Sequence, residues 1–512
     1  MLSYGTTPPL TRTETALSPV TTRLGPIEGT TTHGVQVFRG IPYAAPPLGE
    51  LRFHAPAPAP AWSGTFDATG WGPRSLQADS PLSAGAQGEL SEDCLILNIY
   101  TPAAGDGSGG PGSRPVLVWI HGGAFLMGSA NEYDGSVLAA QGDVVVVTVN
   151  YRLGLFGFLD LSRFAETYAG SASNGFRDQI AALGWVRDNI ADFGGDPGNV
   201  TIFGESAGGG SVNALLSAPS ADGLYHRAIA HSGGTPSTPP ADFTKPLADA
   251  LGVEVDDLLT TLQGMPATEI LALQNRTGIS GSGSSVDGIV VTRPTHVAMA
   301  ERGDACVPYI AGSNRDEGTI FTSMVSGDDA DFSQILATVG MNLARSTMLG
   351  SDPSGYVRAL RQAHPDLDDR ALYERIWVDM FRRASIDNAQ AATAAGPGGW
   401  LYRFDLPATA MGGNFGAAHA AEIAFTFNSF ELPATTLSFH DGSDPVVRDL
   451  ARKWSDTVLA FARTGDPNGA GLPHWPRYST TDRRSIVLDA ESRIEDATLD
   501  AEARAIWKDA SV

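Results

Sequence analysis

The sequence is poor in cysteine and in basic residues. Only two cysteines, Cys94 and Cys306, occur in 512 residues, so no disulfide framework is predicted. The chain has 34 Lys and Arg against 57 Asp and Glu, a formal net charge of −23. Negative charge of this size repels nucleic acids and anionic membranes and favours solubility. The composition therefore argues against a disulfide-rich scaffold and against a nucleic-acid-binding protein.

Several other signals are also missing from the sequence. No apolar run approaches the ~18 residues of a membrane helix. The first residues show no basic stretch followed by an apolar one, so no signal peptide is predicted and a cytoplasmic protein is expected. No metal-binding, Walker A or dinucleotide-binding motif occurs, so neither a metal nor a cofactor is expected. Nothing fixes the oligomeric state, and a monomer is favoured.

The sequence predicts one catalytic domain behind a short disordered segment. Residues 1–18 are rich in Thr, Ser and Pro and are expected to be disordered. Neither an internal repeat nor a long linker divides residues 19–512. The 42% hydrophobic content is enough for one large core. A single α/β domain is therefore predicted.

Apolar runs alternate with helical patterns along this domain. Val116–Ile120 and Val144–Val149 are continuously apolar, as in strands covered on both faces. Strands that alternate with helices predict a large, mostly parallel central sheet flanked by helices. Amphipathic patterns at Pro246–Leu273 and Val357–Gln390 predict helical insertions, at about 235–300 and 320–395, over the active site.

One motif carries a specific chemical signal. Gly204-Glu-Ser206-Ala-Gly208 follows a short β-type run and precedes a plausible helix start. A G-x-S-x-G in this context is typical of a nucleophile elbow, which exposes a serine hydroxyl on a tight strand-to-helix turn. Ser206 also lies at a helix N-terminus, where backbone N–H groups favour developing negative charge. The stretch predicts that Ser206 is a nucleophile.

A serine nucleophile needs a base and an acid that orients the base. On scaffolds with this elbow the acid and then the histidine follow the serine in the chain. Asp316 and Glu317 lie in a loop after a predicted strand, and the spacing does not choose between them. Four histidines follow this loop, namely His364, His419, His440 and His474. His419 is favoured because it lies in a small-residue loop after a predicted strand, and His440 is the reserve candidate.

Two segments are candidates for the oxyanion hole. The N–H of Ala207, directly after the nucleophile, is one expected donor. The turn His121-Gly-Gly-Ala-Phe125 follows the strand Val116–Ile120 and supplies the others. His121 is expected to be a structural residue of this turn.

Together these motifs resemble the type-B carboxylesterase family, which has the α/β-hydrolase fold and includes para-nitrobenzyl esterases and cholinesterases. The resemblance runs from about residue 25 to about residue 478. The matching stretches are Phe38-Arg-Gly-Ile-Pro-Tyr-Ala44, Pro47-Leu-Gly-Glu-Leu-Arg-Phe53, Ser91-Glu-Asp-Cys-Leu95, His121-Gly-Gly-Ala-Phe125, Asn150-Tyr-Arg-Leu-Gly154, Phe193-Gly-Gly-Asp-Pro197, Phe203-Gly-Glu-Ser-Ala-Gly-Gly209, Asp316-Glu-Gly318 and Ala418-His-Ala-Ala-Glu-Ile-Ala-Phe425.

The resemblance implies roles for individual residues. It assigns Ser206 as nucleophile, Glu317 as acid and His419 as base. It also implies that Gly123, Ala124 and Ala207 form the oxyanion hole and that Ser232 supports the triad. Glu205, beside the nucleophile, could either tune the local field or serve a structural purpose.

The resemblance further implies structural pairs, and this chain departs from the family in two places. Arg39 would pair with Glu92, and Arg152 with Asp178. Ser75 stands where family members often carry a cysteine that pairs with the one in Glu-Asp-Cys, so Cys94 is expected to be a free thiol. No Trp occurs between Gln77 and Asp93, which disfavours a cholinesterase.

The predicted function is that of a serine carboxylic-ester hydrolase that forms an acyl-enzyme intermediate on a small-molecule ester. A carbamate or amide hydrolase with the same triad is the alternative. A non-catalytic adhesion-type homologue is disfavoured, because all three triad residues are present. Phe125 and parts of the segments 235–300 and 320–430 are expected to form the pocket wall.

Overall fold

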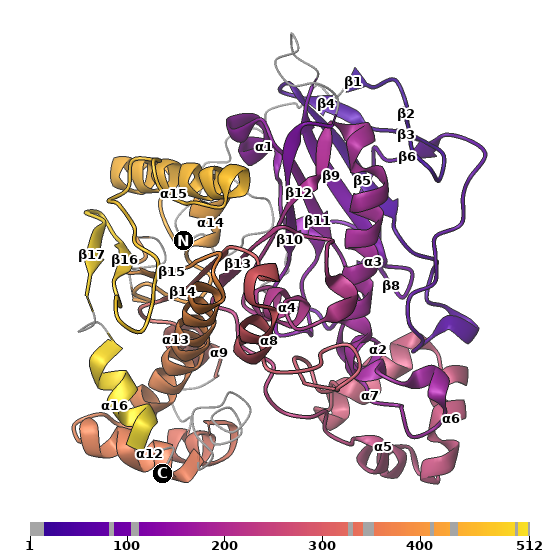
Figure 1. The fold of residues 1–512 in the computed structure, drawn as a ribbon. Coiled ribbons are helices and arrows are strands. Elements are labelled where there is room, and N and C mark those ends of the chain that lie inside the picture. The colour runs from indigo at the N-terminus through magenta and orange to yellow at the C-terminus, as the bar shows by residue number, and fades with distance from the viewer. Residues whose placement is uncertain are drawn as a thin grey trace, which may run out of the picture.

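A large mixed sheet organises the computed structural model, which describes residues 15–80, 86–103, 112–325, 331–340, 353–409, 414–430, 439–496 and 500–509 (Figure 1). Twelve strands of this part of the chain form the sheet. In spatial order they are β1 (Thr15–Ala16), β4 (Thr30–Thr32), β5 (Val35–Pro42), β9 (Ile96–Pro102), β11 (Val145–Val149), β10 (Arg114–Ile120), β12 (Gly195–Glu205), β13 (Arg227–His231), β14 (Tyr309–Asn314), β15 (Gly399–Phe404), β16 (Ser485–Leu488) and β17 (Arg493–Glu495). The strands from β11 to β16 are parallel, whereas the outer strands pair antiparallel. The predicted mostly parallel centre is confirmed.

The central strand β10 shows why these runs are apolar throughout. Successive side chains of a strand point to opposite faces. Val116 and Val118 pack into the core that contains Phe176 of helix α3 (Asn174–Asn189). Leu117 and Trp119 pack into a second core, under helix α15 (Pro445–Thr464). Both faces of β10 are therefore buried, as the continuous apolar run predicts.

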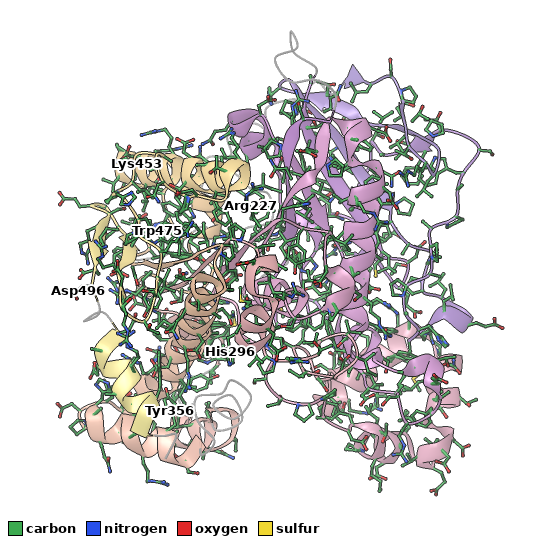
Figure 2. The ribbon with its side chains drawn as sticks, in the orientation of Figure 1. Arg227, His296, Tyr356, Lys453, Trp475 and Asp496 are labelled. Atoms are coloured by element: carbon green, nitrogen blue, oxygen red, sulfur yellow. The ribbon has the colours of Figure 1, made fainter. Side chains whose placement is uncertain are left out.

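Helices cover the two faces of the sheet (Figure 1). On the face of α3 lie α4 (Ala207–Leu215), α8 (Thr295–Arg302) and α13 (Asp369–Ala395). On the face of α15 lie α1 (Ser136–Gly142) and α14 (Ile423–Thr426). In Figure 2, Lys453 points outward from α15, whereas Trp475 is buried and its Nε1 donates to the Leu401 carbonyl at 3.1 Å.

The insertions are shorter helices than the amphipathic patterns suggest. The first contains α5 (Thr244–Leu251), α6 (Leu258–Gly264) and α7 (Ala267–Thr277). The amphipathic pattern over 246–273 is not one continuous helix, because Gly252 adopts a φ of 70° and ends α5. These helices form their own core with α2 (Gly154–Phe158).

The second insertion contains α9 (Gly318–Met324), α10 (Phe332–Ile335), α12 (Pro353–Ala363) and α13. Here the predicted helix 357–390 is divided between α12 and α13, since Pro365 disfavours helical backbone at His364. Tyr356, labelled in Figure 2, joins the two helices through a 2.8 Å hydrogen bond from its hydroxyl to Asp379.

The N-terminal prediction needs a correction. Residues 1–14 lie outside the described residues, but Thr15 and Ala16 pair with Thr31 and Thr30 of β4. This pairing adds Thr15 and Ala16 to the edge of the sheet. The prediction that residues 1–18 are disordered is therefore wrong for these two residues. Two small sheets complete the N-terminal part, with strands β2 (Val20–Thr21), β3 (Pro26–Glu28) and β6 (Phe66–Asp67), and β7 (Arg74–Ser75) and β8 (Leu90–Ser91).

Candidate active site

Ser206 lies on a strained turn at the carboxyl end of β12. Its backbone has φ 57° and ψ −121°, a conformation that residues other than glycine rarely adopt. A Cβ on Gly204 would lie 2.6 Å from the Gly208 backbone, and one on Gly208 would lie 2.0 Å from the Ile120 carbonyl oxygen. Both flanking positions therefore need glycine, which is the physical content of the G-x-S-x-G motif. Such strain is typical of functional sites.

Glu317 and His419 form a short buried contact beside this turn. Oε2 of Glu317 lies 2.6 Å from Nδ1 of His419. Oε1 of Glu317 accepts hydrogen bonds from the Ser232 hydroxyl at 2.6 Å and from the Asn314 N–H at 2.7 Å. Glu317 is fully buried, so these three donors replace the water that a carboxylate needs.

The structure separates the two adjacent acid candidates. Oδ2 of Asp316 accepts the N–H of Ala417 at 2.8 Å and pairs with Arg315 at the surface. Asp316 thus holds the chain just before His419, whereas Glu317 contacts the imidazole itself. The two side chains point in different directions, as expected for neighbours.

The other three histidines lie elsewhere. His364 faces Glu502 of the C-terminal helix α16 (Ala501–Asp509), at 3.3 Å. His440 packs against Phe404 and Phe425, and burial lowers its pKa to about 4. His474 is exposed.

Two aromatic rings hold the His419 imidazole. The Phe381 ring stacks on it at 4.8 Å between centroids with 15° between the planes, and Phe321 lies at 5.0 Å. These rings come from α13 and α9, in the second insertion. Their contact with His419 could not be predicted from the sequence, because any apolar residue of an amphipathic helix fits the same pattern.

Charge around the imidazole favours its protonated form. Nε2 of His419 lies 3.2 Å from Oε1 of Glu205. Burial lowers the pKa of His419, but the negative charges of Glu205 and Glu317 outweigh burial and raise it to about 9. Burial also raises the pKa of Glu205, so the carboxyl and the imidazole compete for one proton.

A second buried carboxyl lies behind the site. Glu422 accepts a hydrogen bond from the Asn314 amide at 2.6 Å. Burial, and then the charge of Glu317, raise the pKa of Glu422 to about 7. Asn314 therefore bridges the two carboxyl groups, a role that its position in a strand does not reveal in the sequence.

The glycine-rich turn after β10 faces Ser206 across one cavity. Gly123 has a φ of 104°, and a Cβ there would lie 2.2 Å from the Met127 carbonyl oxygen. Gly123 and Ala124 line the cavity with Ser206 and His419, and Ala207 begins α4 directly after the serine. First-turn N–H groups of a helix have no partner inside it. His121 is buried and stacks on Tyr151, and burial lowers its pKa to about 4, which fits the predicted structural role.

The cavity has a volume of about 220 Å³. Its described lining residues belong to Gly122–Tyr133, Glu205–Ser206, Ile320–Met324 and His419–Ile423, together with Phe439. The expected wall is therefore corrected in part. Phe125 is half-buried and packs against Phe158 and Phe176 at the edge of the core, and no described lining residue of this cavity comes from 235–300. The helices α5–α7 pack on α2 instead.

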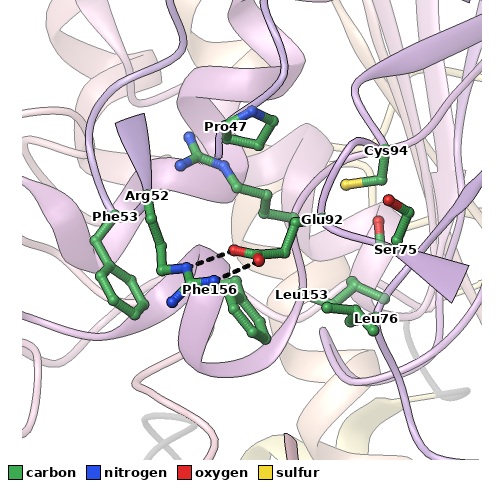
Figure 3. Close-up of a pocket in the computed structure, with 11 residues that line it drawn as sticks. Pro47, Arg52, Phe53, Ser75, Leu76, Glu92, Cys94, Leu153 and Phe156 are labelled. Atoms are coloured by element: carbon green, nitrogen blue, oxygen red, sulfur yellow. Dashed lines mark hydrogen bonds and ion pairs between the residues drawn. The ribbon is translucent and has the colours of Figure 1, made fainter. Parts of the chain in front are cut away.

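One of the two implied ion pairs is confirmed and the other is wrong. Arg152 and Asp178 form a buried bidentate pair at 2.6 and 2.8 Å. Glu92 pairs with Arg52 rather than Arg39, at 2.6 and 2.7 Å (Figure 3). Arg52 follows a short turn that brings its guanidinium to the carboxylate, whereas Arg39 donates to the Thr69 carbonyl.

The cysteine prediction is confirmed. Cys94 and Cys306 are both buried free thiols. Figure 3 shows Cys94 beside Ser75, the residue that stands where the family often has a cysteine. Burial raises the pKa of the Cys94 thiol to about 12, so this thiol stays protonated at neutral pH.

Neither a metal-binding cluster nor a membrane-spanning helix is found among the residues that the structure describes. No group of three or more His, Cys, Asp or Glu side chains there is arranged to hold a metal ion. None of the helices built from these residues combines the length and apolar character that a bilayer crossing needs.

The parallel sheet, the strained serine turn after a central strand and a histidine held by a buried acid define an α/β-hydrolase. Comparison with known proteins identifies the group more closely. The chain matches the carboxylesterase family over residues 17–507 and belongs to that family. It is a carboxylesterase, an enzyme that hydrolyses esters.

The relatives cover nearly the whole chain. The para-nitrobenzyl esterase of Bacillus subtilis is 36% identical over 500 residues, which are 93% of this chain and 96% of the relative. The human cocaine esterase is 34% identical over 96% of this chain and 91% of its own. The crystal structure of the Geobacillus stearothermophilus carboxylesterase EST55 superposes with a TM-score of 0.80, at 36% identity, over 96% of this chain and all of that one.

Proposed function

We propose that this carboxylesterase acts through Ser206, His419 and Glu317 and passes through an acyl-enzyme. Nε2 of His419 removes the hydroxyl proton of Ser206 while Oγ attacks the ester carbonyl carbon. The N–H groups of Gly123, Ala124 and Ala207 stabilise the negative oxygen that forms. The tetrahedral species collapses, the proton on Nε2 passes to the leaving alcohol, and the acyl group stays on Ser206.

Deacylation repeats the sequence with water. His419 takes a proton from a water molecule, which attacks the acyl carbon, and the carboxylic acid leaves as Oγ regains the proton. Glu317 holds Nδ1 and stabilises the imidazolium in both steps. Ser232 and Asn314 keep Glu317 in place through their hydrogen bonds.

The single observation that carries the proposal is the buried 2.6 Å contact between Glu317 and His419 at the cavity that also contains Ser206. A buried carboxylate that fixes one ring nitrogen leaves the other to act as a base. The cavity is small and its lining is largely apolar, which fits the carboxylic esters after which the family is named.

A panel of p-nitrophenyl esters of graded acyl length, with the matching carbamate and anilide, tests the proposal. Short and medium acyl esters should be hydrolysed with a burst of p-nitrophenol before the steady state when deacylation limits the rate. Preferential turnover of the carbamate or anilide would move the assignment to a carbamate or amide hydrolase. No turnover of any ester would overturn it.

We also propose that the protein works as a cytoplasmic monomer on small esters without a cofactor. Two buried thiols and the charge of −23 are compatible with that compartment. Cell fractionation and light scattering test the two points separately.

A further inference from the structure

The His419 imidazole belongs to a closed set of four aromatic rings. Phe381 stacks on the imidazole, with 4.8 Å between the ring centroids and 15° between the planes, and the Phe321 centroid lies at 5.0 Å. The Trp377 ring contacts both phenylalanines, with its centroid 3.8 Å from that of Phe321 and 6.1 Å from that of Phe381. Trp377 and Phe381 are four residues apart on α13, so they lie on one face of this helix. A tilt of the imidazole therefore has to displace Phe381 or Phe321.

The hydrogen bond to Glu317 does not by itself fix the plane of the imidazole. The χ2 angle of histidine has a broad range, and a hydrogen bond tolerates deviations of about 30° from linearity. A tilt about Nδ1 would move Nε2, on the far side of the ring. A planar face stacked on the imidazole opposes this tilt, because the two rings would collide. Phe381 supplies such a face.

Helix α13 is fixed to the sheet next to Phe381. The guanidinium of Arg382, the following residue, is buried and donates to the Tyr402 carbonyl of β15 at 2.7 Å. One turn further along, Oγ of Ser385 donates to the Gly312 carbonyl of β14 at 3.1 Å. These contacts hold Phe381 in place without involving the substrate cavity.

Helix α9 packs directly on α13, which adds its phenylalanine to the set of rings (Figure 1). A Cβ on Gly318 would lie 2.3 Å from the Cα of Glu374, so the two helices approach closely at this glycine. Oγ1 of Thr322 donates to Oε1 of Glu374 at 2.7 Å. Because α9 begins directly after Glu317, the acid and the stacked ring are fixed relative to each other.

Phe381 differs from Phe321 in its relation to the substrate cavity. Phe321 is one of the described residues that line this cavity. Phe381 is 4% exposed and is not among the described lining residues. An effect of Phe381 on the reaction should therefore act through His419 rather than through a contact with the substrate.

We propose that Phe381 is a positioning residue that sets the plane of the His419 imidazole and thereby the direction of Nε2. The second insertion then takes part in the reaction, because its helices orient the base. Positioning of this kind matters for the rate, since a misplacement of about 1 Å can cost about 100-fold. The inference rests on the proposed function, in which His419 is the base.

Phe381→Leu tests the ring, because leucine is apolar but has no planar face. With 4-nitrophenyl butyrate as substrate, kcat should fall by about 10- to 100-fold. KM should change by less than about threefold, because the cavity lining is unchanged. Phe381→Tyr keeps the planar face and should retain kcat within about threefold of the wild type. An equal loss in the tyrosine variant would contradict the role of the ring face.

Phe461→Leu is the matched control. Phe461 is a fully buried phenylalanine of α15 that contacts Trp400, near the amino end of β15, whereas the triad lies at the carboxyl ends of the strands. Both leucine variants should lower the unfolding midpoint. Only Phe381→Leu should lower kcat, and Phe461→Leu should keep it within about threefold of the wild type. An equal fall in kcat would point to core packing in general and would overturn the role of Phe381.

A spectroscopic measurement on the wild-type enzyme covers the case in which Phe381→Leu does not fold. The ring protons of His419, assigned by their loss in His419→Gln, should resonate upfield of those of an exposed histidine, because the ring current of Phe381 shields protons stacked on its face. Resonances at the ordinary position would show that the stack is absent and would overturn the inference.

The outcomes separate this inference from the proposed function. Ester hydrolysis that disappears in Ser206→Ala, with wild-type kcat in Phe381→Leu, would overturn the role of Phe381 alone. A raised KM with unchanged kcat in Phe381→Leu would also overturn it, because Phe381 would then act on substrate binding. Failure to hydrolyse any ester would overturn both.

Discussion

Oε1 of Glu205 lies 3.2 Å from Nε2 of His419, the ring nitrogen opposite the one that Glu317 holds. The imidazole is thus placed between two buried carboxylates. In the proposed mechanism Nε2 accepts the Ser206 proton, so the charge of Glu205 would stabilise the imidazolium that forms during acylation. The same contact also favours the protonated imidazole in the resting enzyme, where it cannot act as a base.

This contact predicts an unusual pH profile. The base must be neutral, so activity rises as pH passes upward through the pKa of His419. That pKa is raised to about 9, whereas an ordinary histidine titrates near ~6.5. The rising limb of kcat/KM should therefore lie well above pH 7, higher than the sequence alone would suggest. Initial rates between about pH 5 and 10 measure it.

Glu205→Gln tests the cause of this shift. Without the charge of Glu205 the protonated imidazole is less stable, so the pKa of His419 falls. The rising limb of the kcat/KM profile should therefore move to lower pH by about one unit or more. Glu166→Gln, which removes an exposed charge on the turn Glu166–Tyr168, should keep the wild-type limb. A wild-type limb near pH 6.5 that does not move in Glu205→Gln would contradict the electrostatic role of Glu205.

The adjacent acids Asp316 and Glu317 provide a matched pair of variants. Glu317→Gln removes the charge that orients and stabilises the imidazolium, and kcat should fall by about 10³–10⁴-fold. Asp316→Asn keeps an oxygen that can accept the Ala417 N–H, and its lost ion pair with Arg315 is partly exposed, so kcat should change by less than about tenfold. Steady-state kinetics on one p-nitrophenyl ester compare the two. Equal losses would contradict the assignment of Glu317 as the acid.

The buried pair Arg152–Asp178 should matter for stability rather than chemistry. Arg152→Met leaves the Asp178 carboxylate buried without its cation, at a cost of about 3–5 kcal/mol. The exposed pair Lys245–Asp249 is the control, and Lys245→Met should cost less than about 1 kcal/mol. Urea unfolding followed by tryptophan fluorescence gives both values. Similar losses in the two variants would contradict the difference in burial.

The parallel centre of the sheet and the serine turn could be predicted because they depend on local sequence. Continuous apolar runs specify strands with two buried faces, and the predicted runs Val116–Ile120 and Val144–Val149 correspond to β10 and β11. The motif around Ser206 is equally local, since Gly204 and Gly208 face backbone atoms that leave no room for a side chain.

Features that depend on distant segments escaped prediction. Whether Arg39 or Arg52 pairs with Glu92 depends on where the turn Gly49–Leu51 lies in the fold. The position of this turn cannot be predicted from the local sequence. The rings of Phe321 and Phe381 reach His419 only because two helices of an insertion fold back over the sheet. The contact of Glu205 with His419 likewise joins residues more than two hundred positions apart.

The nucleophile itself is tested first by substitution. Ser206→Ala removes the attacking oxygen, so kcat should fall by about 10⁴–10⁶-fold, while the circular dichroism spectrum and the unfolding midpoint stay near those of the wild type. Activity within tenfold of the wild type would rule out Ser206 as nucleophile.

The most direct measurement is the site of covalent modification. Wild-type enzyme treated with a fluorophosphonate should gain the mass of one phosphonyl group, and peptide mapping should locate it on Ser206, because only an activated serine attacks this reagent rapidly. The adduct should be absent from Ser206→Ala and strongly slowed in Glu317→Gln. An adduct on another residue, or equal labelling of Ser206→Ala, would contradict the account.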